Sequence, residues 1–131
     1  MKKSFIISVL KDDYAVCRLS AFEPLPDWVL KSSLSSITRT PEEYSVVCPH
    51  EAIPMQDKFS CESEWKCLKV HGPLDFSEVG IISNLTSLLA KAQISVFVIS
   101  TYETDYILVK KMNVDKAAKV LSDSGHEIYY D

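Results

Sequence analysis

Four residues in two short stretches have the properties that binding of a small charged molecule requires. Ser77 and Gly80 lie in the run FSEVGI, where a helix is predicted to begin, and Thr101 and Asp105 flank a polar turn between two apolar runs. The first turn of a helix has unpaired N–H groups and a partial positive charge, which favour a carboxylate. The carboxylate of Asp105 favours an ammonium or guanidinium group. The two stretches together suit a zwitterion such as a free amino acid.

Structural roles for the same residues remain open. Ser77 suits the N-cap of the helix, which puts Gly80 at N3, where Glu or Gln would complete a capping box. Glycine inside a helix costs about 1 kcal/mol relative to alanine, so Gly80 either relieves a close helix–sheet contact or lets another molecule approach the backbone. Asp105 is also an ordinary turn residue. The binding hypothesis therefore depends on the two stretches converging in space.

The second half of the chain predicts elements that bring these stretches together. Alternation and apolar runs predict strands at residues 65–71, 94–100, 105–110 and 126–130. Helical periodicity predicts helices at residues 77–92 and 113–122, the second ended by Gly125. The order β-α-β-β-α-β is the ferredoxin-like arrangement, an antiparallel sheet with both helices on one face. Its topology places the start of the first helix and the turn between the second and third strands at the same end of the sheet.

The first half of the chain predicts a less regular unit. Residues 4–10 and 14–20 are expected to form a β-hairpin across Lys11, Asp12 and Asp13. A short helix follows Pro26, and residues 34–40 and 43–49 are expected to be two further strands. Residues 50–64 read as a connection. We expect an α+β protein with two units, residues 1–62 and residues 63–131.

Composition narrows the classes of partner and the compartment. The 131 residues are 47% hydrophobic and 24% charged, as in an ordinary globular protein. The net charge of -4 gives no reason to expect nucleic acid or an anionic membrane as a partner. We find no targeting segment and no run near the roughly 20 apolar residues of a membrane helix. The prediction is a cytoplasmic protein.

The four cysteines are Cys17, Cys48, Cys61 and Cys67. They could pair in three ways, but a cytoplasmic setting favours free, buried thiols. None lies in a CxxC motif, so neither a zinc site nor another cofactor is expected. Cys48 and His50 put a thiol near an imidazole, but catalysis would also need an orienting group and an oxyanion hole. We therefore expect a protein without enzymatic activity.

The stretch around Gly80 and Asp105 resembles a known family. Residues 74–109, LDFSEVGIISNLTSLLAKAQISVFVISTYETDYILV, are similar to the ACT-domain proteins at the DFS-xx-G helix start and at the ISTYETDYILV turn and strands. The closest resemblance is to small prokaryotic tandem-ACT proteins and to the ACT repeats of CASTOR-type arginine sensors. Residues 43–49, EYSVVCP, match more weakly.

The resemblance implies a tandem ACT protein, with ferredoxin-like βαββαβ units of which the first is rearranged. It implies a non-catalytic regulatory sensor, expected to be a homodimer acting on another protein, that holds an amino acid between ACT units. A protein–protein interaction or dimerisation module without a small ligand remains the alternative. The implied ligand-binding residues are Gly80, Ile81, Thr101, Tyr102 and Asp105 on one wall, Ser45 and Val46 on the other, and Ser83 and Asn84 facing the ligand side chain.

Overall fold

The computed structural model describes residues 4–71 and 80–131. The chain divides into two compact units, which we name by their place in the sequence. The N-terminal unit is Asp12–Trp65, and the C-terminal unit combines Met1–Lys11 with Lys66–Asp131. The assignment of domains to residues 1–62 and 63–131 stays a prediction. None of the helices in the described parts of the chain has the length and apolar content needed to cross a membrane.

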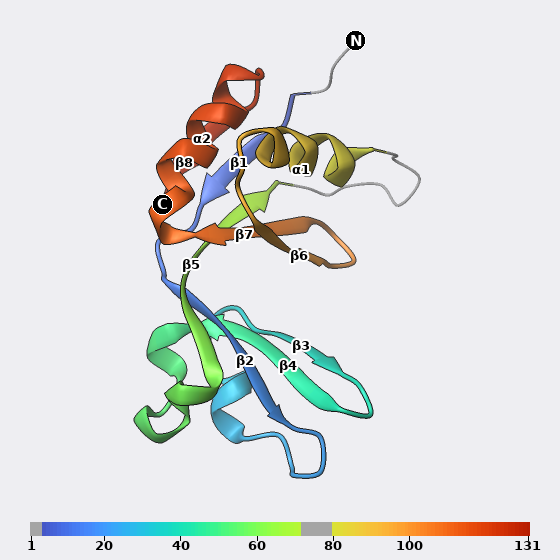
Figure 1. Cartoon of the computed structure of the whole chain (residues 1–131), viewed down its shortest axis with the longest axis vertical. Coiled ribbons are helices and arrows are strands. Elements are labelled where there is room, and N and C mark those ends of the chain that lie inside the picture. The colour runs from blue at the N-terminus through green and yellow to red at the C-terminus, as the bar shows by residue number, and fades with distance from the viewer. Residues whose placement is uncertain (1–3, 72–79) are drawn as a thin grey trace. The chain divides into compact units, whose positions relative to one another are not determined.

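The N-terminal unit is an antiparallel sheet with short 3-10 helices (Figure 1). Its strand order is β3-β4-β2-β5, in which β5 contributes its first half. Alternate residues of β2 and β4, such as Ala15 and Val46, point into a core that Val29 and Ile53 complete. The elements are β2 (Tyr14–Ser20), η1 (Asp27–Leu30), β3 (Ser36–Arg39), β4 (Glu43–Pro49), η2 (His50–Ala52), η3 (Met55–Ser60) and β5 (Cys61–Val70).

The C-terminal unit is a sheet with two helices packed on one face (Figure 1). Its strand order is β6-β7-β5-β1-β8, with β5 contributing its second half. The order of β5, α1, β6, β7, α2 and β8 along the chain confirms the predicted ferredoxin-like, α+β fold. The further elements are β1 (Ile6–Val9), α1 (Ile81–Lys91), β6 (Val96–Ser100), β7 (Asp105–Lys110), η4 (Lys111–Asn113), α2 (Val114–Asp123) and β8 (Glu127–Tyr130).

The N-terminal strand β1 is an insertion in this sheet. It runs antiparallel to β5 and parallel to β8, so it separates two strands that are neighbours in the simple ferredoxin-like order. Ile7 and Val9 join Leu68 and Val70 in the core beneath the helices. The predicted hairpin of residues 4–10 and 14–20 is therefore wrong, because β2 pairs instead with β4 and β5. Alternation shows that a strand is half buried, but it does not name its partner.

One pair of cysteines also differs from the prediction. Cys17 and Cys61 lie directly opposite each other in β2 and β5 and form a disulfide, so the expectation of free thiols is wrong for both. Cys48 and Cys67 are free and buried, as predicted. Pairing across 44 residues depends on strand register, which cysteine spacing alone does not reveal.

Candidate functional site

The start of α1 is a helix N-terminus whose N-cap residue has no side chain to cap it. Gly80 is the N-cap rather than the predicted N3 residue, and its φ of 81° lies in the left-handed region that favours glycine. Its carbonyl accepts the first helical bond, from the N–H of Asn84 at 2.8 Å. Among the described residues no side chain caps the helix, and the N–H groups of its first turn have no partner within the helix. The predicted cap, Ser77, lies outside the described residues.

The surroundings of Gly80 test whether a close helix–sheet contact explains glycine at this position. A Cβ atom built at this residue would meet no described atom within 4 Å. The backbone angle, rather than crowding by the described residues, therefore accounts for glycine at this position.

The turn between β6 and β7 is closed by its own threonines. The N–H of Thr101 donates to the carbonyl of Thr104 at 2.8 Å, and the Thr101 hydroxyl accepts from the Thr104 N–H at 3.2 Å. The Thr104 hydroxyl is buried and donates to the carbonyl of Val70 at the end of β5. The turn is thus tied to the strand from which the chain leaves toward α1.

Asp105 lies on the face of the sheet that the helices cover. Ile107 and Val109 of β7 pack in the core with the helices, and strand alternation puts Asp105 on the same face. Ser100 is its direct partner across the hairpin, and Val98 on the same face remains 36% exposed. The start of α1 and the turn lie at the same end of this unit, at the right in Figure 1. This end offers a positive helix start and a negative carboxylate.

The other predicted site residues are distributed around this end and in the N-terminal unit. Ser83 and Asn84 are exposed on the first turn of α1, whereas Ile81 packs partly on the core. Tyr102 is 80% exposed on the turn. Ser45 is partly buried, and Val46 is fully buried in the core of the N-terminal unit. Because the whole of Val46 is buried, this structure leaves it no exposed surface for a ligand. The ligand roles of all these residues stay predictions.

The environment of Cys48 does not support catalysis by a pair formed from its thiol and the imidazole of His50. Its side chain is fully buried, and burial raises the pKa of the thiol to about 11. The thiol therefore stays protonated at neutral pH, whereas a nucleophilic cysteine needs its thiolate. The described residues also contain no group of three or more His, Cys, Asp or Glu side chains placed to hold a metal ion.

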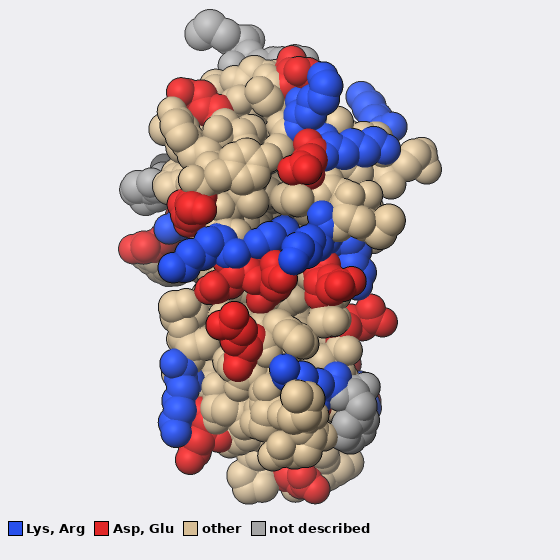
Figure 2. All heavy atoms as spheres, turned by 90° about the vertical axis from the view of Figure 1, so that its left-hand side faces the viewer, with Lys and Arg blue, Asp and Glu red and all other residues tan. Residues whose placement is uncertain are grey.

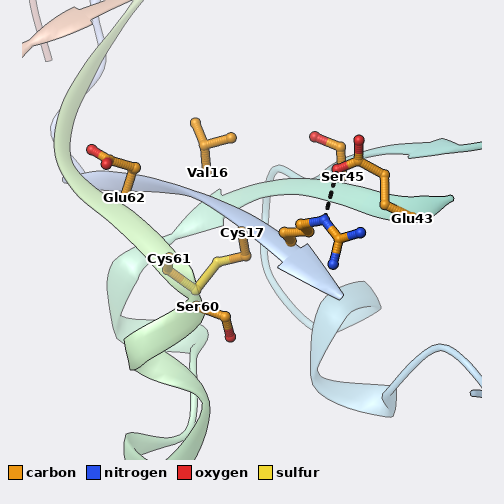
Figure 3. Close-up of a pocket in the computed structure, with 8 residues that line it drawn as sticks. Val16, Cys17, Glu43, Ser45, Ser60, Cys61 and Glu62 are labelled. Carbon is orange, nitrogen blue, oxygen red and sulfur yellow. Dashed lines mark ion pairs between the residues drawn. A yellow bond between two sulfur atoms is a disulfide. The ribbon is translucent and has the colours of Figure 1, made fainter. Parts of the chain in front are cut away.

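A hollow in the N-terminal unit was missed by the sequence reasoning. It is open, has a volume of about 480 Å³ and is bordered by the Cys17–Cys61 disulfide (Figure 3). Arg18 lies beside it, 4.0 Å from the Glu43 carboxylate. Polar residues alternate with core residues in β2 and β4, which could have indicated a polar face. The lining residues are Val16, Cys17, Arg18, Glu43, Ser45, Ser60, Cys61 and Glu62.

The charge on one face of the chain is of mixed sign. On the face shown in Figure 2, Lys and Arg side chains lie among Asp and Glu side chains. On this face acidic side chains lie directly beside the basic ones (Figure 2), which lowers its attraction for phosphate groups.

Comparison with known proteins identifies relatives along the whole chain. Residues 60–123 match the family model of the ACT domain, and residues 12–56 match a second model, which describes an N-terminal domain. The crystal structure of protein Atu0741 from Agobacterium tumefaciens is 34% identical, with a TM-score of 0.90. The alignment covers 99% of this chain and 96% of that one.

Two human proteins are similar over shorter stretches. CASTOR3P is 35% identical over 98 residues, which cover 66% of this chain and 60% of that protein. The cytosolic arginine sensor for mTORC1 subunit 1 is 36% identical over 58 residues, covering 44% of this chain and 18% of the sensor. The chain thus spans less than two thirds of either human relative.

Proposed function

Because this chain belongs to the ACT-domain proteins, we propose that it is a regulatory protein without catalytic activity that binds a free amino acid. The observation that carries the proposal is the position of Asp105 and of the start of α1, which no described side chain caps, at one end and on one face of the C-terminal sheet. In the proposed complex the α-carboxylate of the ligand accepts hydrogen bonds from the helix N–H groups. Asp105 binds a cationic group of the ligand.

Arginine is the first amino acid to test. The human relative that matches over 58 residues is named as a cytosolic arginine sensor, and arginine carries two cationic groups that a carboxylate can bind. We propose that Gly80, Ile81, Ser83, Asn84, Thr101 and Tyr102 complete this wall of the site. We keep Ser45 and Val46 as predicted contacts from the N-terminal unit.

We further propose a cytoplasmic homodimer whose output passes through another protein, since the human sensor is named as a subunit.

The test is thermal unfolding of the chain with each of the twenty amino acids. A ligand at about 100 times its Kd should add about 2.7 kcal/mol to the free energy of unfolding. We expect at least one amino acid to raise the Tm, and the proposal fails if none does.

Asp105→Asn should abolish that rise while preserving the fold, because the amide keeps the shape of the carboxylate and removes its charge. Glu103→Gln is the matched control, since Glu103 is an exposed carboxylate in the same turn. The control should respond like the wild type. A normal response of Asp105→Asn would remove Asp105 from the site without removing binding itself.

An interaction module without a small ligand is the second candidate. Its support is the exposure of large side chains at the β8 edge of the C-terminal sheet, where Ile6 is 45% and Tyr129 is 52% exposed. Strand β8 pairs with β1, and its other edge has no partner strand among the described residues. Ultracentrifugation of the same samples separates the candidates, because this module would dimerise although no amino acid raises its Tm.

A further inference from the structure

The disulfide of the N-terminal unit joins two neighbouring strands at the same level. Cys17 is in β2 and Cys61 is the first residue of β5, and the two are direct partners in the antiparallel ladder. Both residues border the open hollow described above, and Figure 3 shows the bond beside Ser60. The hollow therefore reaches the two residues that form the bond.

The two cysteines differ in their exposure to a reagent dissolved in water. Cys17 is 1% exposed and belongs to the core of the unit, where Val46 is its partner on the other side of β2. Cys61 is only partly buried, at the point where η3 ends and β5 begins. Because exchange requires approach to a sulfur atom, attack at Cys61 is favoured over attack at Cys17.

The remaining cysteines do not compete for this chemistry. Cys48 and Cys67 are each 0% exposed. Burial raises the pKa of Cys48 to about 11 and that of Cys67 to about 12, so both remain protonated and unreactive at neutral pH. Exchange with thiols in the folded chain is therefore expected only at Cys17 and Cys61.

We propose that the Cys17–Cys61 disulfide is a reversible modification site for low-molecular-weight thiols, which enter at Cys61. A thiolate RS⁻ attacks Sγ of Cys61, the bond between the two cysteines breaks, and a mixed disulfide forms at Cys61. Sγ of Cys17 leaves as a thiolate and takes a proton from water. A second RS⁻ attacks the sulfur of R, which releases RSSR and the Cys61 thiolate, and this thiolate is then protonated. The protein gains two electrons, and two thiols are oxidised to one disulfide.

This proposal is independent of amino-acid binding, and its kinetics can be measured on the wild-type chain. The folded protein is incubated with increasing concentrations of reduced glutathione, quenched with acid and mapped by mass spectrometry without further reduction. We expect a rate of opening proportional to the glutathione concentration, an adduct at Cys61, and unmodified Cys48 and Cys67. A rate that does not change with glutathione concentration would overturn the proposal, because opening would then wait for unfolding.

Two matched variants test the predicted asymmetry. Cys17→Ser leaves the partly exposed thiol of Cys61, and Cys61→Ser leaves the buried thiol of Cys17. With oxidised glutathione, Cys17→Ser should form its adduct at least about tenfold faster than Cys61→Ser. Equal rates in two folded variants would contradict entry at Cys61. If circular dichroism shows that either variant is unfolded, the test is the position of the adduct in the wild-type chain. An adduct at Cys61 supports entry at Cys61, and an adduct at Cys17 contradicts it.

Discussion

At the scale of single residues, Gly80 links the backbone to the proposed site. Its left-handed conformation turns the chain into α1, and no described side chain caps the first N–H groups of this helix. A side chain at this position would be strained whatever the space around it. The same residue thus sets the direction of the helix start in the proposed site.

Gly80→Ala should therefore destabilise the chain by about 1 kcal/mol, the lower end of the cost of the left-handed conformation for an L-residue. Urea unfolding measures this loss as a shift of the midpoint at constant slope. Ser83→Ala is the control, because Ser83 is exposed in the first regular turn of α1 and alanine favours a helix. A loss of equal size in both variants would mean that the backbone angle of Gly80 is not the cause.

Asp105 and Gly80 show what could be predicted from the sequence and what could not. Asp105 begins a strand of otherwise apolar residues, so the strand itself could be predicted from the sequence. Its face could not, because Ile107, Leu108 and Val109 are consecutive and all buried. The position of Gly80 in the helix could not be predicted to the residue, since the apolar stripe of a helix does not show where its first turn begins.

At the scale of elements, β1 depends on contacts made by the two residues that precede it. The N–H of Phe5 donates to Nδ1 of His126 at 3.1 Å, and the two rings stack with their centroids 5.7 Å apart. The carbonyl of Phe5 accepts from the N–H of Glu127, and the hydroxyl of Ser4 donates to the carbonyl of Gly125. These bonds hold β1 parallel to β8, a pairing between the two ends of the chain that local periodicity cannot predict.

Acid should weaken this attachment through His126. Burial lowers the pKa of His126 below its usual 6.5, and its Nδ1 must be unprotonated to accept the Phe5 N–H. The neutral ring is favoured in the folded state, so its contribution to the free energy of unfolding is complete above pH 6.5. That contribution is lost as the pH falls from 6.5 through the folded pKa.

Chemical denaturation at pH values on both sides of 6.5 measures this loss. His126→Asn keeps a side-chain acceptor for the Phe5 N–H but does not titrate, so its stability should fall less steeply with acid than that of the wild type. Parallel curves for the two proteins would exclude His126 as the group responsible.

At the scale of the whole molecule, the sequence predicts two units but not how the chain is shared between them. Residues 94–100 and 105–110 could be assigned as neighbouring strands because a four-residue polar turn leaves little choice of partner. By contrast, β5 pairs with β2 in its first half and with β1 in its second half. The disulfide and the hollow beside it follow from this shared strand, and neither has a local sequence signal.

The disulfide should stabilise one unit selectively, because Cys17 and Cys61 both lie in Asp12–Trp65. Closing a loop of this sequence separation is worth about 2–4 kcal/mol, chiefly by restricting the unfolded chain. Replacing both cysteines with alanine should therefore reduce hydrogen-exchange protection in β2 and β4 while sparing α2 and β7. Cys67→Ala gives the reverse control, since Cys67 is buried in the C-terminal unit and its loss should act on that unit. Equal loss of protection in both units after either substitution would mean that the chain opens as one cooperative body, so that the bond stabilises the C-terminal unit as well.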